Sequence, residues 1–130
     1  MPHLRSIAAG LALVLTAASP ATAAEFRAFD QPAFAAALAE GRPVLVDVHA
    51  WWCPVCASQN HSIKRTVIAP KFDRLIVFRL DYDKQKAEWK GFGVRKQATL
   101  IAFRGGHEVG RLAYVTDKDR IDALLASAVQ

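Results

Sequence analysis

The chain contains two cysteines, Cys53 and Cys56, which stand three residues apart. A pair at this spacing can close a small disulfide ring and open it again. So short a loop removes little entropy from the unfolded chain, which makes the ring a poor structural staple. The spacing therefore favours redox chemistry, with a metal site or a structural disulfide as alternatives. Residue 57 is Ala rather than His, so the haem-attachment pattern C-x-x-C-H is absent.

The start of the chain has the pattern of a secretory signal peptide. His3 and Arg5 form a short basic region, residues 7–18 are apolar and uncharged, and small residues follow at 20–24. The apolar stretch is short for a helix that crosses a bilayer. We therefore expect a signal peptide over residues 1–24, cleavage after Ala23 or Ala24, and export to the periplasm. A retained N-terminal anchor is the alternative.

Strand and helix signals alternate through residues 25–130, which we expect to form one domain. Apolar runs and a Gly105-Gly106 turn predict four strands, at residues 44–50, 75–80, 99–103 and 108–113. Cap and stop signals predict four helices, at residues 30–39, 53–68, 84–90 and 116–129. Thr116 and Asp119 have the spacing of a capping box for the last helix. This order predicts an α/β fold with a mixed sheet covered on both faces.

Cys53 falls where a predicted strand gives way to a predicted helix. Free backbone N–H groups and the positive end of the helix dipole favour a thiolate there, so we expect Cys53 to be the accessible, attacking sulfur. Cys56, one turn further along, can resolve a mixed disulfide. Trp52 and Pro54 flank Cys53 and suit an exposed rim and a helix start.

Two segments of the chain resemble the thioredoxin family. Residues 47–56 read DVHAWWCPVC and resemble the thioredoxin active-site segment, in which an aspartate ends a strand before W-C-x-x-C. Residues 92–106 read FGVRKQATLIAFRGG and resemble Y-G-I-R-x-x-P-T-L-x-x-F-x-x-G. The spacing between the segments also matches. The resemblance covers nearly all of residues 25–130 and implies a thioredoxin-like fold, with a central mixed β-sheet flanked by helices.

The resemblance also implies roles for residues near the cysteine pair. Asp47 would accept the proton of Cys56 when that thiol attacks the mixed disulfide; a strand-end aspartate bonded to backbone or lysine is the alternative. Arg79 falls near the place where thioredoxins often carry a lysine that faces this aspartate. The residues expected to contact substrate are Trp52, Pro54, Gln97, Ala98 and Thr99.

Three positions depart from the family pattern. Pro54-Val55 stands where the family usually has Gly-Pro, His49 stands where it usually has Trp, and Ala98 replaces the cis-proline that faces the cysteines. Without proline a cis bond costs about 2.5–4 kcal/mol, so we expect a trans Gln97–Ala98 bond and a reshaped loop. Ala98 leaves room, which favours a narrow client range and access of soft metals to the thiolates. We expect His49 to be a packed strand residue, with a catalytic or ligand role as the alternative.

These observations predict an extracytoplasmic thiol–disulfide oxidoreductase that uses Cys53 and Cys56 through a mixed disulfide. By resemblance we favour reduction, with electrons arriving from a membrane thiol electron-transfer protein and passing to exported protein disulfides. The alternatives are an oxidase of exported thiols and a metal-binding module without turnover.

The remaining features limit cofactors and partners. We expect no cofactor and no metal, and no pair of histidines has helical metal spacing. The formal charge is +5, but the Lys and Arg residues are scattered and no aromatic-interleaved stripe accompanies them. We therefore expect no nucleic-acid partner.

Overall fold

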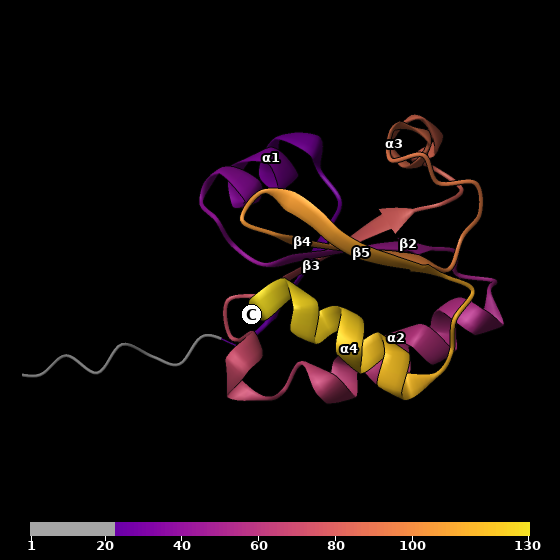
Figure 1. The fold of residues 1–130 in the computed structure, drawn as a ribbon. Coiled ribbons are helices and arrows are strands. Elements are labelled where there is room, and N and C mark those ends of the chain that lie inside the picture. The colour runs from indigo at the N-terminus through magenta and orange to yellow at the C-terminus, as the bar shows by residue number, and fades with distance from the viewer. Residues whose placement is uncertain (1–22) are drawn as a thin grey trace, which may run out of the picture.

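A five-stranded mixed sheet forms the centre of the protein (Figure 1). The structure, a computed structural model, describes residues 23–130. The strands are β1 (Glu25–Ala28), β2 (Val44–His49), β3 (Ile76–Asp81), β4 (Thr99–Arg104) and β5 (His107–Ala113). Their order in the sheet is β1-β3-β2-β4-β5, with β1, β3 and β2 parallel and β4 and β5 antiparallel to their neighbours. The predicted mixed sheet is confirmed.

Helices cover both faces of the sheet. The helices are α1 (Gln31–Ala39), α2 (Pro54–Thr66), α3 (Lys86–Gly91) and α4 (Lys118–Val129), with a short 3-10 helix at Pro70–Phe72. Figure 1 shows α1 and α3 on one side of the sheet and α2 and α4 on the other. Among residues 23–130, no helix has the length and apolar character needed to cross a membrane.

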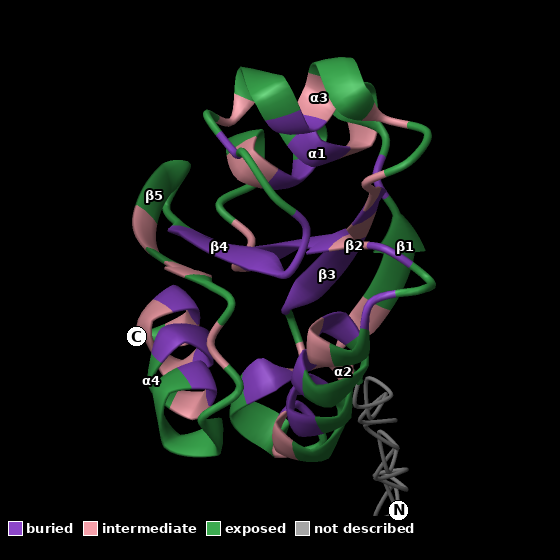
Figure 2. Cartoon of the chain, turned by 90° about the vertical axis from the view of Figure 1, so that its right-hand side faces the viewer, coloured by how far each residue is buried: buried purple, intermediate pink, exposed green. Residues whose placement is uncertain are grey.

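The alternation of β2 decides which side chains reach each face. Val44, Val46 and Val48 pack with the phenylalanines of the core under α1 and α3, whereas Leu45 packs with the core under α2 and α4. Asp47 has the same parity as Leu45, so the pleat turns its side chain toward α2. The burial colours of Figure 2 show β2, β3 and β4 almost wholly buried between the two helical layers.

Two details differ from the sequence predictions. β1 was not predicted, because its four residues are mostly exposed and lack the apolar alternation that marks a strand. It forms by pairing its backbone with β3 at the sheet edge. The predicted capping box of α4 is wrong: the cap is Asp117, whose carboxylate accepts the Arg120 N–H at 2.9 Å. The predicted signal peptide lies outside the described residues, apart from Ala23 and Ala24.

Candidate active site

The cysteine pair lies at the start of α2, just after the turn that connects it to β2. Cys53 is the N-cap residue of α2, and its Sγ accepts the backbone N–H of Cys56 at 3.1 Å. Pro54 occupies the first helical position, where no N–H is needed. Both cysteines are free thiols. The helix therefore begins on a sulfur atom, and a backbone dipole points at it.

Both sulfurs lie in a small apolar cluster with Ala50 and Ala98, against which Tyr82 also packs. Cys53 is 4% exposed and Cys56 is fully buried. Cys53 is thus the more accessible of the two thiols, but it is itself largely covered, because Ala50 and Ala98 pack beside the pair. Little of either sulfur is therefore exposed to solvent.

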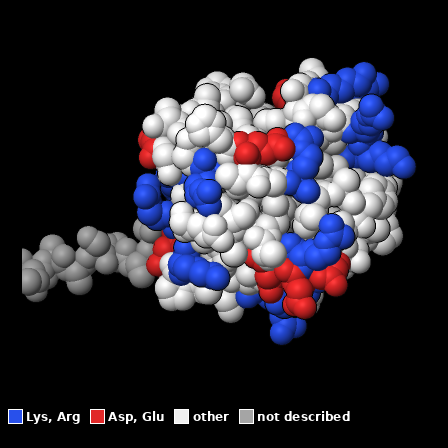
Figure 3. All heavy atoms as spheres, in the orientation of Figure 1, with Lys and Arg blue, Asp and Glu red and all other residues white. Residues whose placement is uncertain are grey.

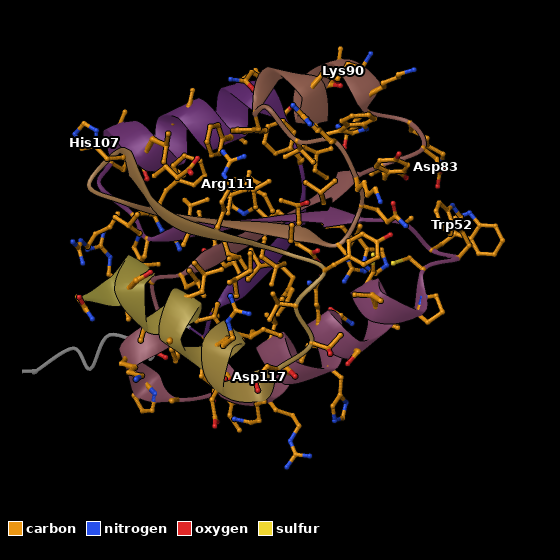
Figure 4. The ribbon with its side chains drawn as sticks, turned by 45° about the vertical axis from the view of Figure 1, so that its right-hand side comes forward. Trp52, Asp83, Lys90, His107, Arg111 and Asp117 are labelled. Carbon is orange, nitrogen blue, oxygen red and sulfur yellow. The ribbon has the colours of Figure 1, made fainter. Side chains whose placement is uncertain are left out.

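Two exposed tryptophans precede Cys53. Trp52 is half exposed, and its Nε1–H donates to both carboxylate oxygens of Asp83, at 3.1 and 3.2 Å. Figure 4 shows Trp52 and Asp83 together at one end of the molecule. Trp51 is 86% exposed. The exposed rim predicted from Trp52 and Pro54 is confirmed.

Ala98 is held in an unusual backbone conformation beside the cysteines. The described residues contain no cis peptide bond, so the Gln97–Ala98 bond is trans, as predicted. Ala98 has φ 59°, a left-handed conformation that costs a residue with a Cβ about 1–2 kcal/mol. Its N–H donates to the Val48 carbonyl at 2.8 Å, and its carbonyl accepts the Tyr114 N–H at 2.9 Å. Both main-chain groups of Ala98 therefore have partners inside the protein.

Gln59 is a structural residue of the site that the sequence analysis missed. It is fully buried on α2, and its Nε2 donates to the carbonyls of Ala98 and Val115, each at 3.0 Å. A polar residue on the buried face of α2, between Cys56 and Ile63, was the available signal. Gln59 ties the Ala98 loop to the helix that carries the cysteines.

The other residues predicted to contact substrate differ in exposure. Gln97 is nearly buried, and its Nε2 donates to the Tyr114 hydroxyl at 2.6 Å. Thr99 is buried, and its hydroxyl donates to the Lys96 carbonyl at 3.0 Å. Tyr114 is exposed and could meet a client beside Gln97. The substrate-binding roles of these residues stay predictions.

Asp47 is a buried carboxylate under the cysteine pair. It is 1% exposed, its Oδ2 lies 3.7 Å from Arg79 Nε, and its Oδ1 has no hydrogen-bond partner. Arg79 faces Asp47 across the β2–β3 pairing, which confirms that prediction. Burial raises the pKa of Asp47 from 3.8 to about 6, and the Arg79 charge offsets only part of that rise. Asp47 is therefore mainly ionised at pH 7 and has a high affinity for a proton.

Cys56 holds its proton tightly. Burial, the hydrogen bond with Cys53 and the charges of Cys53 and Asp47 raise the pKa of Cys56 to about 12. At pH 7 Cys56 is therefore a neutral thiol and must lose its proton in order to attack. The arrangement provides a sulfur at a helix N-terminus, a buried second thiol and a carboxylate that can take up a proton.

Two further features bear on metal and nucleic-acid binding in the described part of the chain. Within residues 23–130, no group of three or more His, Cys, Asp and Glu side chains could hold a metal ion. Figure 3 shows Lys and Arg scattered over the face in view, with Asp and Glu between them. His61 and His107 are exposed, and Trp89 is packed in the core.

Comparisons with known proteins agree with this geometry. Residues 25–127 match the family model described as Thioredoxin. A thioredoxin of Alicyclobacillus acidocaldarius is 32% identical over 97 residues, which are 75% of this chain and 91% of that protein. A thioredoxin of Chlamydia muridarum is 33% identical over 96 residues, with 74% and 91% covered. The crystal structure of Trxlp from Edwardsiella tarda superposes with a TM-score of 0.75 at 39% identity, covering 78% of this chain and 98% of that one.

Proposed function

The chain belongs to the thioredoxin family, whose members are thiol–disulfide oxidoreductases, and on that premise we propose that it reduces disulfides of exported proteins. The observation that carries this proposal is the contact between Cys53 Sγ and the Cys56 N–H at the start of α2. A thiolate at Cys53 gains both a hydrogen bond and the helix dipole there. Cys53 is therefore the attacking sulfur and Cys56 the resolving one.

The reaction runs in two steps. The Cys53 thiolate attacks one sulfur of the client disulfide, a bond forms between Cys53 and that sulfur, and the other client sulfur leaves and takes a proton from solvent. The Cys56 thiol then attacks Cys53 Sγ and transfers its proton to Asp47. The Cys53–Cys56 disulfide forms, and the second client sulfur leaves as a thiolate. The client gains two electrons, which come from the two protein thiols.

The Ala98 loop supports a narrow choice of clients. An extended client could pair with the backbone of this loop only through free N–H or C=O groups. The N–H of Ala98 is bonded to Val48, and its carbonyl is bonded to Tyr114 and Gln59. We therefore expect client recognition to rest on the side chains of Trp52, Pro54 and Gln97, and general disulfide-reductase activity to be weak.

Export and the direction of electron flow complete the proposal. The pattern of residues 1–24 supports a cleaved signal peptide and a periplasmic location, where a membrane thiol electron-transfer protein supplies the electrons. Sequencing of the exported protein should give Ala24 or Glu25 as the first residue, and an intact Met1 would contradict export. A reduction potential near roughly −270 mV supports reduction, and one near roughly −120 mV supports oxidation instead.

Trapping of clients tests the assignment of the two cysteines. Cys56→Ser should accumulate mixed disulfides with exported proteins, whereas Cys53→Ser should accumulate none. Insulin reduction should be lost in both variants and be slow in the parent. If Cys53→Ser traps clients as efficiently as Cys56→Ser, the assignment is wrong.

A further inference from the structure

A cleft of about 510 Å³ opens beside the site, on the α2 side of the sheet edge. We call it the edge cleft; its lining includes Phe26, His49, Trp51, Lys64, Arg79 and Asp81. These residues come from β1, β2, β3, α2 and the turn before Cys53. Neither cysteine lines the cleft. The redox chemistry described above makes no use of it.

Two buried polar atoms near the edge cleft have no hydrogen-bond partner. They are Asp47 Oδ1 and His49 Nδ1. His49 Nδ1 lies 3.9 Å from the other Asp47 oxygen, Oδ2. This separation is too long for a direct hydrogen bond, and only a small change in the tilt of the ring would bring the two atoms within bonding distance. The His49 ring thus lies between a buried carboxylate and an open cleft.

Asp47 needs a route for its proton. Each resolution step leaves the Cys56 proton on Asp47, and that carboxylate is 1% exposed. Two basic side chains lie within 4 Å of it, Arg79 at 3.7 Å and His49 at 3.9 Å. A guanidinium stays protonated and cannot accept a proton. An imidazole can accept a proton on one nitrogen and release one from the other.

We propose that His49 is the proton relay between Asp47 and the solvent of the edge cleft. The inference rests on the proposed function, because it requires Asp47 to accept the Cys56 proton. Protonated Asp47 gives its proton to His49 Nδ1, and the imidazolium releases its Nε2 proton to water in the cleft. The ring regains its first tautomer by turning about its Cβ–Cγ bond, which exchanges the positions of the two nitrogens. Asp47 is then ionised again and His49 is neutral, as before the resolution step.

The charged groups around His49 are compatible with this exchange. They are Asp47 on the same strand, Arg79 and Asp81 on β3, Lys64 on α2 and Arg27 on β1. Burial and the Arg79 charge lower the pKa of His49. The negative charge of Asp81 offsets only part of this decrease. The ring is therefore neutral at pH 7 and can accept a proton. Burial raises the pKa of Asp47 to about 6, which brings it closer to the ordinary pKa of an imidazole.

Stopped-flow kinetics with Ellman's reagent test the relay. Reduced protein releases one thionitrobenzoate when Cys53 attacks the reagent and a second when Cys56 resolves the mixed disulfide. The protein is first held either in acid, where Asp47 is protonated, or at neutral pH, where it is ionised. Both samples are then mixed with excess reagent at neutral pH. After acid loading, Asp47 must lose its proton before it can assist Cys56.

His49→Gln should slow the second release about tenfold after acid loading and leave it unchanged after neutral loading. The matched control is His61→Gln, at an exposed histidine on α2. This variant should leave the second release unchanged after either loading. In His49→Ala, added imidazole should restore the rate after acid loading. Pyrazole, a ring of the same size that is scarcely basic, should not restore it.

The outcomes separate the relay from the proposed function. Asp47→Asn should slow the second release after either loading; if it does not, Asp47 is not the proton acceptor and the proposed function is wrong at that step. If Asp47→Asn is slow but His49→Gln behaves alike after both loadings, the relay is wrong while the role of Asp47 stands. A shift in the pH midpoint of the second release without a loading effect would assign His49 a structural role and would also overturn the relay.

Discussion

Asp47→Asn isolates the energetic cost of a carboxylate held inside the sheet. Asp47 is 1% exposed, and one of its oxygens accepts no hydrogen bond. Arg79 lies 3.7 Å from the other oxygen but is itself 41% exposed, so it does not compensate for the lost hydration. Asparagine has nearly the same shape as protonated aspartic acid and carries no charge. We therefore expect the variant to be more stable than the parent at neutral pH.

The size of the gain follows from the pKa of Asp47. Burial raises it from 3.8 to about 6, and one pKa unit corresponds to about 1.36 kcal/mol. Ionisation of Asp47 therefore lowers the free energy of unfolding by about 3 kcal/mol above pH 6. Because the folded pKa is raised, this loss is absent below pH 3.8 and develops as the pH rises from 3.8 to 6. Asp47→Asn should gain about 3 kcal/mol above pH 6 and almost nothing below pH 3.8.

Urea unfolding of the reduced protein, followed by tryptophan fluorescence at both pH values, measures this difference. Asp119→Asn is the matched control, because Asp119 lies exposed in the first turn of α4. Its carboxylate favours the helix dipole, so the control should lose about 0.3–1 kcal/mol at neutral pH. An equal gain for Asp47→Asn at both pH values, or no gain above pH 6, would refute the reasoning.

Other variants test the parts that hold the site together. Ala98→Gly should raise the free energy of unfolding by about 0.5–1 kcal/mol, since glycine adopts φ 59° without strain. Ala98→Pro should lower it by about 3 kcal/mol or more, because proline requires φ near −65° and cannot donate to Val48. Gln59→Leu removes the hydrogen-bond donor of the Val115 carbonyl and should lower the free energy of unfolding, measured by urea unfolding, by about 2–3 kcal/mol. Cys53→Ala should lose about 1 kcal/mol with the cap of α2, whereas Cys53→Ser should keep it; equal losses would mean that the sulfur is no cap.

Local signals were sufficient for much of the fold. Pro54 and the cysteine that precedes it marked the start of α2, because a proline at the first helical position and a cap residue before it act within one turn. The apolar run at 44–50 predicted β2, and the glycine pair predicted the β4–β5 hairpin. β1 could not be predicted in this way. Its four residues carry no pattern of their own and become a strand through hydrogen bonds to β3.

The sequence by itself determined where the thiol chemistry lies, which residues belong to the family's active-site segment, and which three positions depart from it. The tertiary structure decided what surrounds that chemistry. It placed Ala98 beside Cys53 and Cys56, bonded Gln59 to that loop, and brought Arg79 to Asp47. Arg79 reaches Asp47 only because β2 and β3 pair in one register. A shift of one residue would turn every side chain of a strand to the opposite face, and no local signal specifies that register.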